Sequence, residues 1–211
     1  MKHFAPLLFA SLFAFAGCDQ LLDNDMERLE EINDQYNRDE SEAALKEAKK
    51  YVKDFPDSCE GWCLMGWIYL DFDKYDKAEE CFDKCLEIDE NWDNAYVGKG
   101  SMYRGMGENQ KARSAYRKAI DILPDNAEAY ASLLVIELME GNDQKAVECG
   151  EKAWAISTDQ PVVPANLSVA YHYLGDQQKR DYFYDQAARL GYHNLDRLQQ
   201  IYSGELTIRD E

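Results

Sequence analysis

Residues 59–92 read CEGWCLMGWIYLDFDKYDKAEECFDKCLEIDENW, and residues 93–126, which follow directly, read DNAYVGKGSMYRGMGENQKARSAYRKAIDILPDN. Aligned without a gap, the two segments place small, aromatic and charged residues at the same positions, 34 residues apart. Five longer series keep this spacing: Tyr69, Tyr103 and Tyr171; Lys77, Lys111, Lys145 and Lys179; Ala78, Ala112 and Ala146; Cys85, Ala119, Ala153 and Ala187; Ile88, Ile122, Ile156 and Leu190. A fixed period of this length is the signature of a repeat architecture.

Each 34-residue unit has the pattern of a helical hairpin. From Trp62 to Tyr69, apolar and small residues fall at i, i+3, i+4 and i+7, which is one face of a helix. Asp71-Phe72-Asp73 ends this first helix, and apolar residues from Ala78 to Leu86 give the second helix its buried face. Small residues fall where the two helices must cross closely, and large aromatic residues fill the space around the crossing.

The pattern resembles the tetratricopeptide repeat (TPR), whose consensus is Trp, Leu-Gly and Tyr, followed by Ala, Phe, Ala and Pro. Residues that carry it in the first segment are Trp62, Met65-Gly66, Tyr69, Ala78, Phe82 and Cys85, and in the second Tyr96, Gly100, Tyr103, Ala112, Tyr116, Ala119 and Pro124. The resemblance implies an all-α fold, a right-handed α-solenoid of about five helical hairpins with a C-terminal capping helix. It says less about function, because one scaffold serves many functions.

The later repeats depart from the consensus in places. Leu134 stands at the first-helix glycine of one repeat and Gly150 at its second-helix aromatic, and Pro164 stands at the tryptophan position of the next repeat. We predict the following organisation: a signal peptide at 1–17, a lipidated N-terminus with a short linker at 18–24, a degenerate TPR at 25–58, four further TPRs at 59–92, 93–126, 127–160 and 161–194, and a capping helix with a tail at 195–211.

The N-terminus has the pattern of an export signal. A short positive start is followed by an apolar run, Phe4–Phe15, which is too short to span a bilayer. Cys18 directly after Ala16-Gly17 resembles the lipobox of bacterial lipoproteins, although Phe15 stands where Leu is commonest. The resemblance implies that Cys18 carries diacylglycerol and acyl chains such as palmitate, which anchor a soluble body to a membrane. The alternative is a plain secretory signal in which Cys18 is incidental.

The residue after Cys18 does not decide which membrane would hold the lipid anchor. An Asp at this position, Asp19 here, retains lipoproteins in the inner membrane of enterobacteria, whereas acidic residues there accompany surface export in some other phyla. We therefore expect a lipid-anchored protein of the bacterial cell envelope, at either the inner membrane or the outer membrane and surface.

Charge excludes one class of partner. Asp and Glu number 41 against 23 Lys and Arg, which gives a net charge of −18. Such a surface repels the phosphates of nucleic acids. It fits either simple solubility or a basic partner.

The spacing of the cysteines allows three interpretations, which are a metal site, a disulfide and simple packing. Cys59 and Cys63 are four residues apart, as are Cys81 and Cys85, and Cys149 stands alone. This spacing suggests a four-thiolate metal site, but the repeat register places Cys85 between helices, Cys63 in the inner groove and Cys81 with Cys149 at the periphery, so they should not converge. We expect small-residue packing, with one disulfide within the 59–85 repeat as the alternative.

No catalytic constellation stands out. After removal of the signal only His172 and His193 remain, too few for a histidine triad or a histidine metal cluster, and no glycine-rich phosphate loop is present. We therefore predict a protein that is not an enzyme, and that has no cofactor or metal beyond the lipid on Cys18.

In TPR proteins the first helices line a groove that binds ligands, so the resemblance implies groove contacts. The predicted groove residues are Trp67, Leu70, Asp71, Val97, Ser101, Arg104, Val135, Leu138, Val169, His172 and Tyr173. TPR domains that grip a chaperone C-terminal carboxylate use Lys, Asn and Arg here, and the matching positions, Cys63, Trp67, Gly98, Glu128 and Ser132, do not fit that mode. An apolar groove with acidic edges favours an amphipathic or apolar peptide with basic flanks. The alternative is that Trp67, Val135 and Tyr173 pack between repeats.

The function expected from this reading is a membrane-anchored scaffold or adaptor for protein or peptide partners in the envelope. Bacterial TPR lipoproteins serve as pilotins, adaptors for peptidoglycan enzymes or parts of outer-membrane assembly machines, and no residue chooses between these. The alternative is a lipoprotein that captures a small ligand, such as a glycan or a lipid, in the groove.

Overall fold

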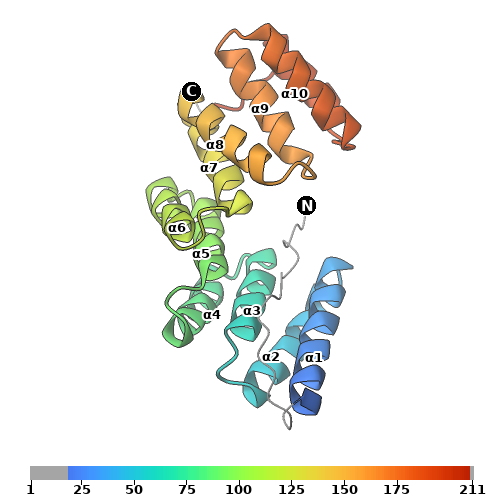
Figure 1. The fold of residues 1–211 in the computed structure, drawn as a ribbon, viewed down its shortest axis with the longest axis vertical. Helices are drawn as coiled ribbons and strands as arrows, with labels where there is room; N and C mark the ends of the chain where they lie inside the picture. Colours follow the sequence, from blue (N-terminus) through green and yellow to red (C-terminus); the bar gives the residue numbers. More distant parts are fainter. Residues whose placement is uncertain (1–18, 210–211) are drawn as a thin grey trace. The chain divides into compact units, whose positions relative to one another are not determined.

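The computed structural model describes residues 19–209, and the side chains of residues 25–209. The predicted signal peptide, 1–17, and the predicted lipidation residue, Cys18, lie outside the described residues. Every regular element within the described range is a helix (Figure 1). The helices are α1 (Asp19–Asn37), α2 (Ser41–Asp54), α3 (Cys59–Asp71), α4 (Tyr75–Ile88), α5 (Asp93–Gly105), α6 (Asn109–Ile122), α7 (Ala127–Met139), α8 (Asp143–Ile156), α9 (Val162–Tyr173), α10 (Gln177–Arg189) and α11 (Leu195–Tyr202). The predicted all-α class is confirmed.

Each predicted repeat contains two helices, and two ends of the chain add detail. Helix α1 begins at Asp19, so most of the segment that we predicted as a linker, 18–24, is helical. At the other end, α11 packs against α9 and buries Leu198 and Ile201, as a capping helix would. Among the helices of residues 19–209, none combines the length and apolar character needed to cross a bilayer.

The chain divides into two compact units between Met106 and Gly107. Unit 1 contains α1–α5 and unit 2 contains α6–α11. Successive helices pack against one another from α1 to α5 in unit 1 and from α6 to α10 in unit 2, and the first helices of neighbouring repeats also meet, α3 with α5 and α7 with α9. Each unit has its own apolar core, so each can be described by itself.

The turn between the two helices of every hairpin uses a left-handed residue. Asp39, Asp73, Gly107, Gly141 and Gly175 have φ between 53° and 76°, and they are spaced 34 residues apart. At four of these turns the next residue donates its N–H to a carbonyl five residues earlier, as Lys74 does to Tyr69 at 3.0 Å. Glycine adopts this conformation without steric cost and Asp tolerates it. These turn residues form a sixth series with the 34-residue spacing, which we did not predict from the sequence because both Asp and Gly occur in it.

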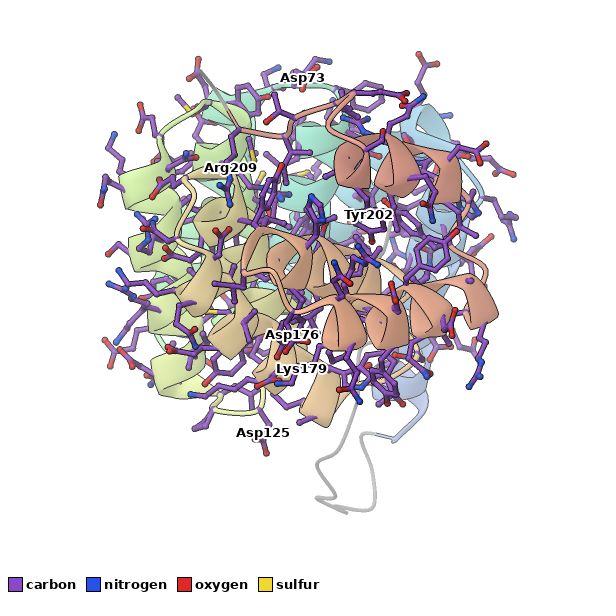
Figure 2. The ribbon with its side chains drawn as sticks, turned by 90° about the horizontal axis from the view of Figure 1, so that it is seen from above. Asp73, Asp125, Asp176, Lys179, Tyr202 and Arg209 are labelled. Atoms are coloured by element: carbon purple, nitrogen blue, oxygen red, sulfur yellow. A yellow bond between two sulfur atoms is a disulfide. The ribbon has the colours of Figure 1, made fainter. Side chains whose placement is uncertain are left out.

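The lysine series has a structural explanation in both units. The Nζ of Lys77 lies 5.7 Å from the ring centroid of Tyr69, and the Nζ of Lys179 lies 4.7 Å from that of Tyr171. Lys179, labelled in Figure 2, also donates a hydrogen bond to the Tyr171 hydroxyl at 2.9 Å. The second helix of a hairpin therefore holds a cation against the tyrosine of its own first helix, a contact worth about 0.5–1 kcal/mol at an exposed site.

The closest helix crossings in unit 1 surround one aromatic ring. A Cβ added at Gly66 would lie 2.7 Å from the fully buried ring of Phe82, and one added at Gly98 would lie closer still. Gly66 is on α3, Phe82 on α4 and Gly98 on α5, so the ring joins one hairpin to the first helix of the next. The absence of a side chain at both glycines allows the three helices to approach this closely.

In unit 2 a glycine and a large side chain also meet at a close helix crossing, but they have exchanged helices. A Cβ added at Gly150, on α8, would lie 2.6 Å from Leu167 and 3.1 Å from Leu134. In this repeat the large side chain is on the first helix and the glycine is on the second, the reverse of Gly66 and Phe82. The departure seen in the sequence is therefore a compensated exchange, and the crossing stays close.

A second exchange concerns a polar contact. In unit 1 the Tyr103 hydroxyl donates to Glu79 at 2.9 Å. In unit 2 the positions 34 residues later are Glu137 and Arg113, and the Arg113 guanidinium donates to Glu137 at 2.8 Å and to Glu140 at 2.6 Å. Arg113 and Glu137 are both buried. Glu137, which interrupts the tyrosine series, therefore comes with a matching change at its partner.

A disulfide joins Cys59, the first residue of α3, to Cys85 on α4. Our expectation of simple packing is wrong for this pair, and the alternative of one disulfide within the 59–85 repeat holds, because the hairpin brings the start of its first helix against the last turn of its second helix. Cys63, expected in the groove, is buried, as is Cys81, while Cys149 is half-buried. In the described part of the chain no set of three or more His, Cys, Asp or Glu side chains could hold a metal ion, and the pairing of Cys59 with Cys85 leaves no four-thiolate site.

Replacing Gly98 by Ala should destabilise unit 1, because the new methyl group overlaps the Phe82 ring. Overpacking costs about 1–3 kcal/mol, which exceeds the ~1 kcal/mol that Ala gains over Gly in a helix. Unfolding by urea can be followed by tryptophan fluorescence, since three of the four tryptophans, Trp62, Trp67 and Trp92, lie in unit 1. The second change Phe82→Leu should cost less in the Gly98→Ala background than in the parent chain. Equal costs would show that the ring is not the cause.

Reduction of the Cys59–Cys85 disulfide should lower the free energy of unfolding by about 3 kcal/mol, because the cross-link no longer limits the conformations of the unfolded chain. The variant Cys59→Ala/Cys85→Ala should not respond to reductant. Thiol titration in denaturant should find two more thiols after reduction of the parent chain. A parent chain with the same thiol count and the same stability before and after reduction would contradict the disulfide.

Candidate partner-binding surface

The predicted groove residues of α3 lie together on one helix of unit 1. The Trp67 indole is half-buried: its Nε1 donates to Asn94 Oδ1 on α5 at 3.1 Å, and its ring stands edge-on to Phe82 with centroids 6.0 Å apart. Leu70 packs at the edge of the unit 1 core, and the carboxylate of Asp71 accepts a hydrogen bond from Ser41 at 3.4 Å. Trp67 is therefore fixed in position, with part of its ring at the surface.

On α5, also in unit 1, the predicted residues differ in exposure. Val97 is 1% exposed, Ser101 is half-buried and Arg104 is exposed. Among the predicted residues of α5, only Ser101 and Arg104 therefore present side-chain surface, in addition to the surface of Trp67 on α3.

In unit 2 the predicted residues lie on α7 and α9. Val135 is half-buried, whereas Leu138 and Val169 are 1% and 2% exposed and belong to the unit 2 core. His172 and Tyr173 are half-buried neighbours at the end of α9, with ring centroids 5.4 Å apart. The accessible predicted surface of unit 2 is thus Val135 together with the His172–Tyr173 pair.

Three of the predicted contacts do not present surface. Val97, Leu138 and Val169 were placed in the groove by their position in the repeat, and their side chains are instead enclosed. A helical position next to the contact between neighbouring first helices can point into that contact or out of it, and the sequence pattern does not separate the two. These residues contribute to packing within the protein.

The titratable side chains near these residues have altered acidity. Burial, and after it the positive charge of Arg180, lower the pKa of His172, so its ring is neutral at pH 7. Burial raises the pKa of the Cys81 thiol to about 12 and that of Cys149 to about 11. Both thiols are therefore protonated at neutral pH and are poor nucleophiles.

The C-terminal segment contacts the predicted groove residues of α9, which the sequence did not predict. Tyr202, at the end of α11, donates a hydrogen bond to Ser168 at 2.7 Å, and its ring centroid lies 5.1 Å from that of His172. Burial raises the pKa of Tyr202 to about 12. Further along, the guanidinium of Arg209, a residue labelled in Figure 2, lies over Tyr173. The distance from the guanidinium carbon to the ring centroid is 3.6 Å. The predicted groove residues of α9 are therefore covered in part by the end of the chain, and only a tertiary structure could reveal this.

A hollow of about 480 Å³ lies on unit 1 among α1, α2 and the start of α3. Its floor is apolar and aromatic, with Leu29, Tyr51 and Phe55, and acidic residues stand on its rim. Leu29, Tyr51 and Phe55 were not among the predicted contacts, since they belong to the degenerate first repeat.

Two segments of the chain match the tetratricopeptide repeat family, residues 59–91 and residues 93–126. The chain is also similar to the mitochondrial import receptor subunit TOM70 of Rattus norvegicus, with 30% identity over 118 residues, which are 56% of this chain and 19% of that protein. The chain thus spans about a fifth of the length of this relative.

Solved structures share the fold. The structure of pilF from Pseudomonas aeruginosa matches with a TM-score of 0.73 at 17% identity, over 87% of this chain and 86% of that chain. YrrB, a TPR protein with an unusual peptide-binding site, matches with a TM-score of 0.56 at 16% identity, over 90% of this chain and 96% of that chain. At these identities the likeness concerns the fold alone, and it confirms the predicted TPR-type α-solenoid.

Proposed function

We propose that this chain, which carries tetratricopeptide repeats, is a scaffold for protein–protein interaction that acts as a lipid-anchored adaptor for protein or peptide partners in a bacterial cell envelope. It would be a binding protein and not an enzyme, with no cofactor other than the lipid on Cys18. The proposal has three parts: the anchor, the compartment and the binding surface.

The anchor is proposed from the lipobox-like Phe15-Ala16-Gly17-Cys18. Helix α1 begins at Asp19, directly after this cysteine. A lipid on Cys18 would therefore be attached next to the first hairpin, and the repeats would act near the membrane surface. Two or more acyl chains on one residue suffice for stable anchoring.

The compartment is supported by the Cys59–Cys85 disulfide. Structural disulfides persist in oxidising compartments such as the bacterial periplasm and the cell surface, and are rare in the cytosol. The disulfide thus agrees with export by the N-terminal signal, independently of the lipobox. It does not distinguish the inner from the outer membrane.

The observation that carries the binding function is the half-buried indole of Trp67, held by Asn94 and by the edge of Phe82. A large aromatic side chain that is fixed in place yet partly at the surface loses little entropy when a partner covers it. Leu70 adds apolar surface beside it, and Asp71 adds negative charge. An apolar segment with basic flanks, from a protein or a peptide, fits this combination.

A pull-down from solubilised envelopes tests the binding surface. We expect the intact, lipid-bearing chain to capture a discrete partner and the Trp67→Ala variant to lose at least tenfold of it, because the removed ring is the main apolar contact. Tyr182→Ala is the matched control, since Tyr182 is an aromatic residue of α10 that is 53% exposed and lies outside the predicted groove. Unchanged capture by a folded Trp67→Ala chain would reject this surface.

The anchor has its own test. The Cys18→Ala variant should fail to incorporate labelled palmitate and should leave the membrane fraction, because it lacks the sulfur to which the lipid is attached. The parent chain should label and remain with the membranes. Labelling that persists in the variant would show that the lipid is attached at another residue, and a parent chain recovered without lipid would leave a plain secretory signal as the explanation.

The hollow on unit 1 favours a second candidate, capture of a small ligand such as a lipid or a glycan. Its apolar and aromatic floor would suit an acyl chain better than a sugar, and its acidic rim would disfavour an anionic headgroup. Thermal shift measurements with neutral lipids and glycans would separate this candidate from peptide binding, provided that Leu29→Ala abolishes any stabilisation and Trp67→Ala does not.

A further inference from the structure

Residues 203–209, here called the tail, follow α11 and return along unit 2. Gly204, with φ of 77°, begins the reversal, and the N–H groups of Glu205 and Leu206 both donate to the carbonyl of Gln200, at 2.9 and 3.1 Å. These bonds fix the start of the tail to the end of α11. The direction of the tail is therefore set by a helix-terminal turn of a common kind.

The remainder of the tail has the pattern of an extended segment with one face bound. Leu206 and Ile208 are half-buried and pack against the core of unit 2, whereas Thr207 between them is exposed. Such alternation is typical of an extended chain that presents every second side chain to a surface. The tail thus contacts unit 2 as a peptide ligand would.

Arg209 provides the strongest contacts of the tail. Its guanidinium lies over the ring of Tyr173, 3.6 Å from the centroid, and forms an ion pair with Asp143 at the start of α8. The Asp143 side chain is 14% exposed and that of Arg209 is 32% exposed. Gly141 lies alongside, since a Cβ added there would be 3.8 Å from Arg209. An arginine is suited to such a site because its planar cation stacks on an aromatic ring and pairs with a carboxylate at the same time.

The contact is incomplete in one respect. The Nε of Arg209 is buried and has no hydrogen-bond partner. A buried donor without an acceptor weakens a contact relative to one in which every donor is paired. A competing segment whose arginine also finds an acceptor for Nε would therefore bind this site more tightly than the tail does.

We propose that Tyr173, Asp143 and the adjoining apolar surface of α9 form a peptide-binding site, which the tail occupies until a partner displaces it. The partner carries an extended segment with two alternating apolar side chains followed by an arginine, the chemistry of Leu206-Thr207-Ile208-Arg209. This inference rests on the proposed adaptor function and specifies its ligand. The net charge of −18 attracts such a basic segment.

The tail peptide itself is the probe that tests the site. A labelled peptide of residues 203–211 is titrated by fluorescence anisotropy against the full chain and against a chain that ends at Tyr202. A tethered tail has an effective concentration on the order of 1 mM, so a peptide with a dissociation constant of ~100 µM should bind the full chain about tenfold more weakly than the shortened chain. The same peptide with Arg209→Ala should lose most of its binding to the shortened chain.

Variants of the full chain separate displacement from loss of fold. Arg209→Ala should admit the peptide and speed amide hydrogen exchange across residues 205–209, whereas the control Glu205→Gln, at an exposed position, should do neither. Asp143→Asn should speed the same exchange but should also weaken binding of the peptide, because it removes the carboxylate that pairs with the arginine. If the shortened chain does not fold, these variants carry the test alone. Equal peptide binding by the full chain and by the shortened or Arg209→Ala chain, or no binding by these two chains while they keep their helicity, would overturn the proposal.

The peptide titration and the envelope pull-down can fail separately. The titration uses purified protein and no membrane, so its failure would leave the envelope pull-down and the Trp67 surface of unit 1 untouched. A pull-down that captures nothing, beside a successful titration, would reject the envelope role and keep the peptide site.

Discussion

The ring of Phe82, packed against Gly66 and Gly98, is the contact on which the structure of unit 1 depends. It sets the distance between two helices of one hairpin and the first helix of the next, since a methyl group at either glycine would overlap it. Trp67 stands edge-on to the same ring and bonds to α5. The position of the candidate binding residue is thus a consequence of the packing that joins the repeats.

The fold could be predicted because close crossings constrain residue size at fixed spacing. The 34-residue series of tyrosine and lysine, for example, meet within a hairpin, where Lys77 lies over Tyr69 and Lys179 over Tyr171. The departures were harder to interpret from one sequence. Leu134 with Gly150, and Glu137 with Arg113, look like losses of pattern when taken singly, and become exchanges once the structure shows which positions face each other.

The site was predicted less well than the fold, for a physical reason in each case. Val97, Leu138 and Val169 have the right position in the repeat, but a small rotation of a helix decides whether such a position faces solvent or a neighbour. The Cys59–Cys85 bond depends on where the hairpin places its ends. Arg209 meets Asp143 across 66 residues of sequence, and no local pattern encodes that contact.

Both units present an aromatic residue where the first helices could receive a partner, Trp67 in unit 1 and Tyr173 in unit 2, and in unit 2 the tail already shows how a peptide could bind. The central claim is that these first-helix residues contact a partner in the cell. The most direct measurement is photo-crosslinking in living cells, with a photoreactive phenylalanine analogue at position 67 and, in a second strain, at position 182. The account predicts one discrete adduct from position 67 and none from 182; no adduct from 67, or the same adducts from both positions, would contradict it.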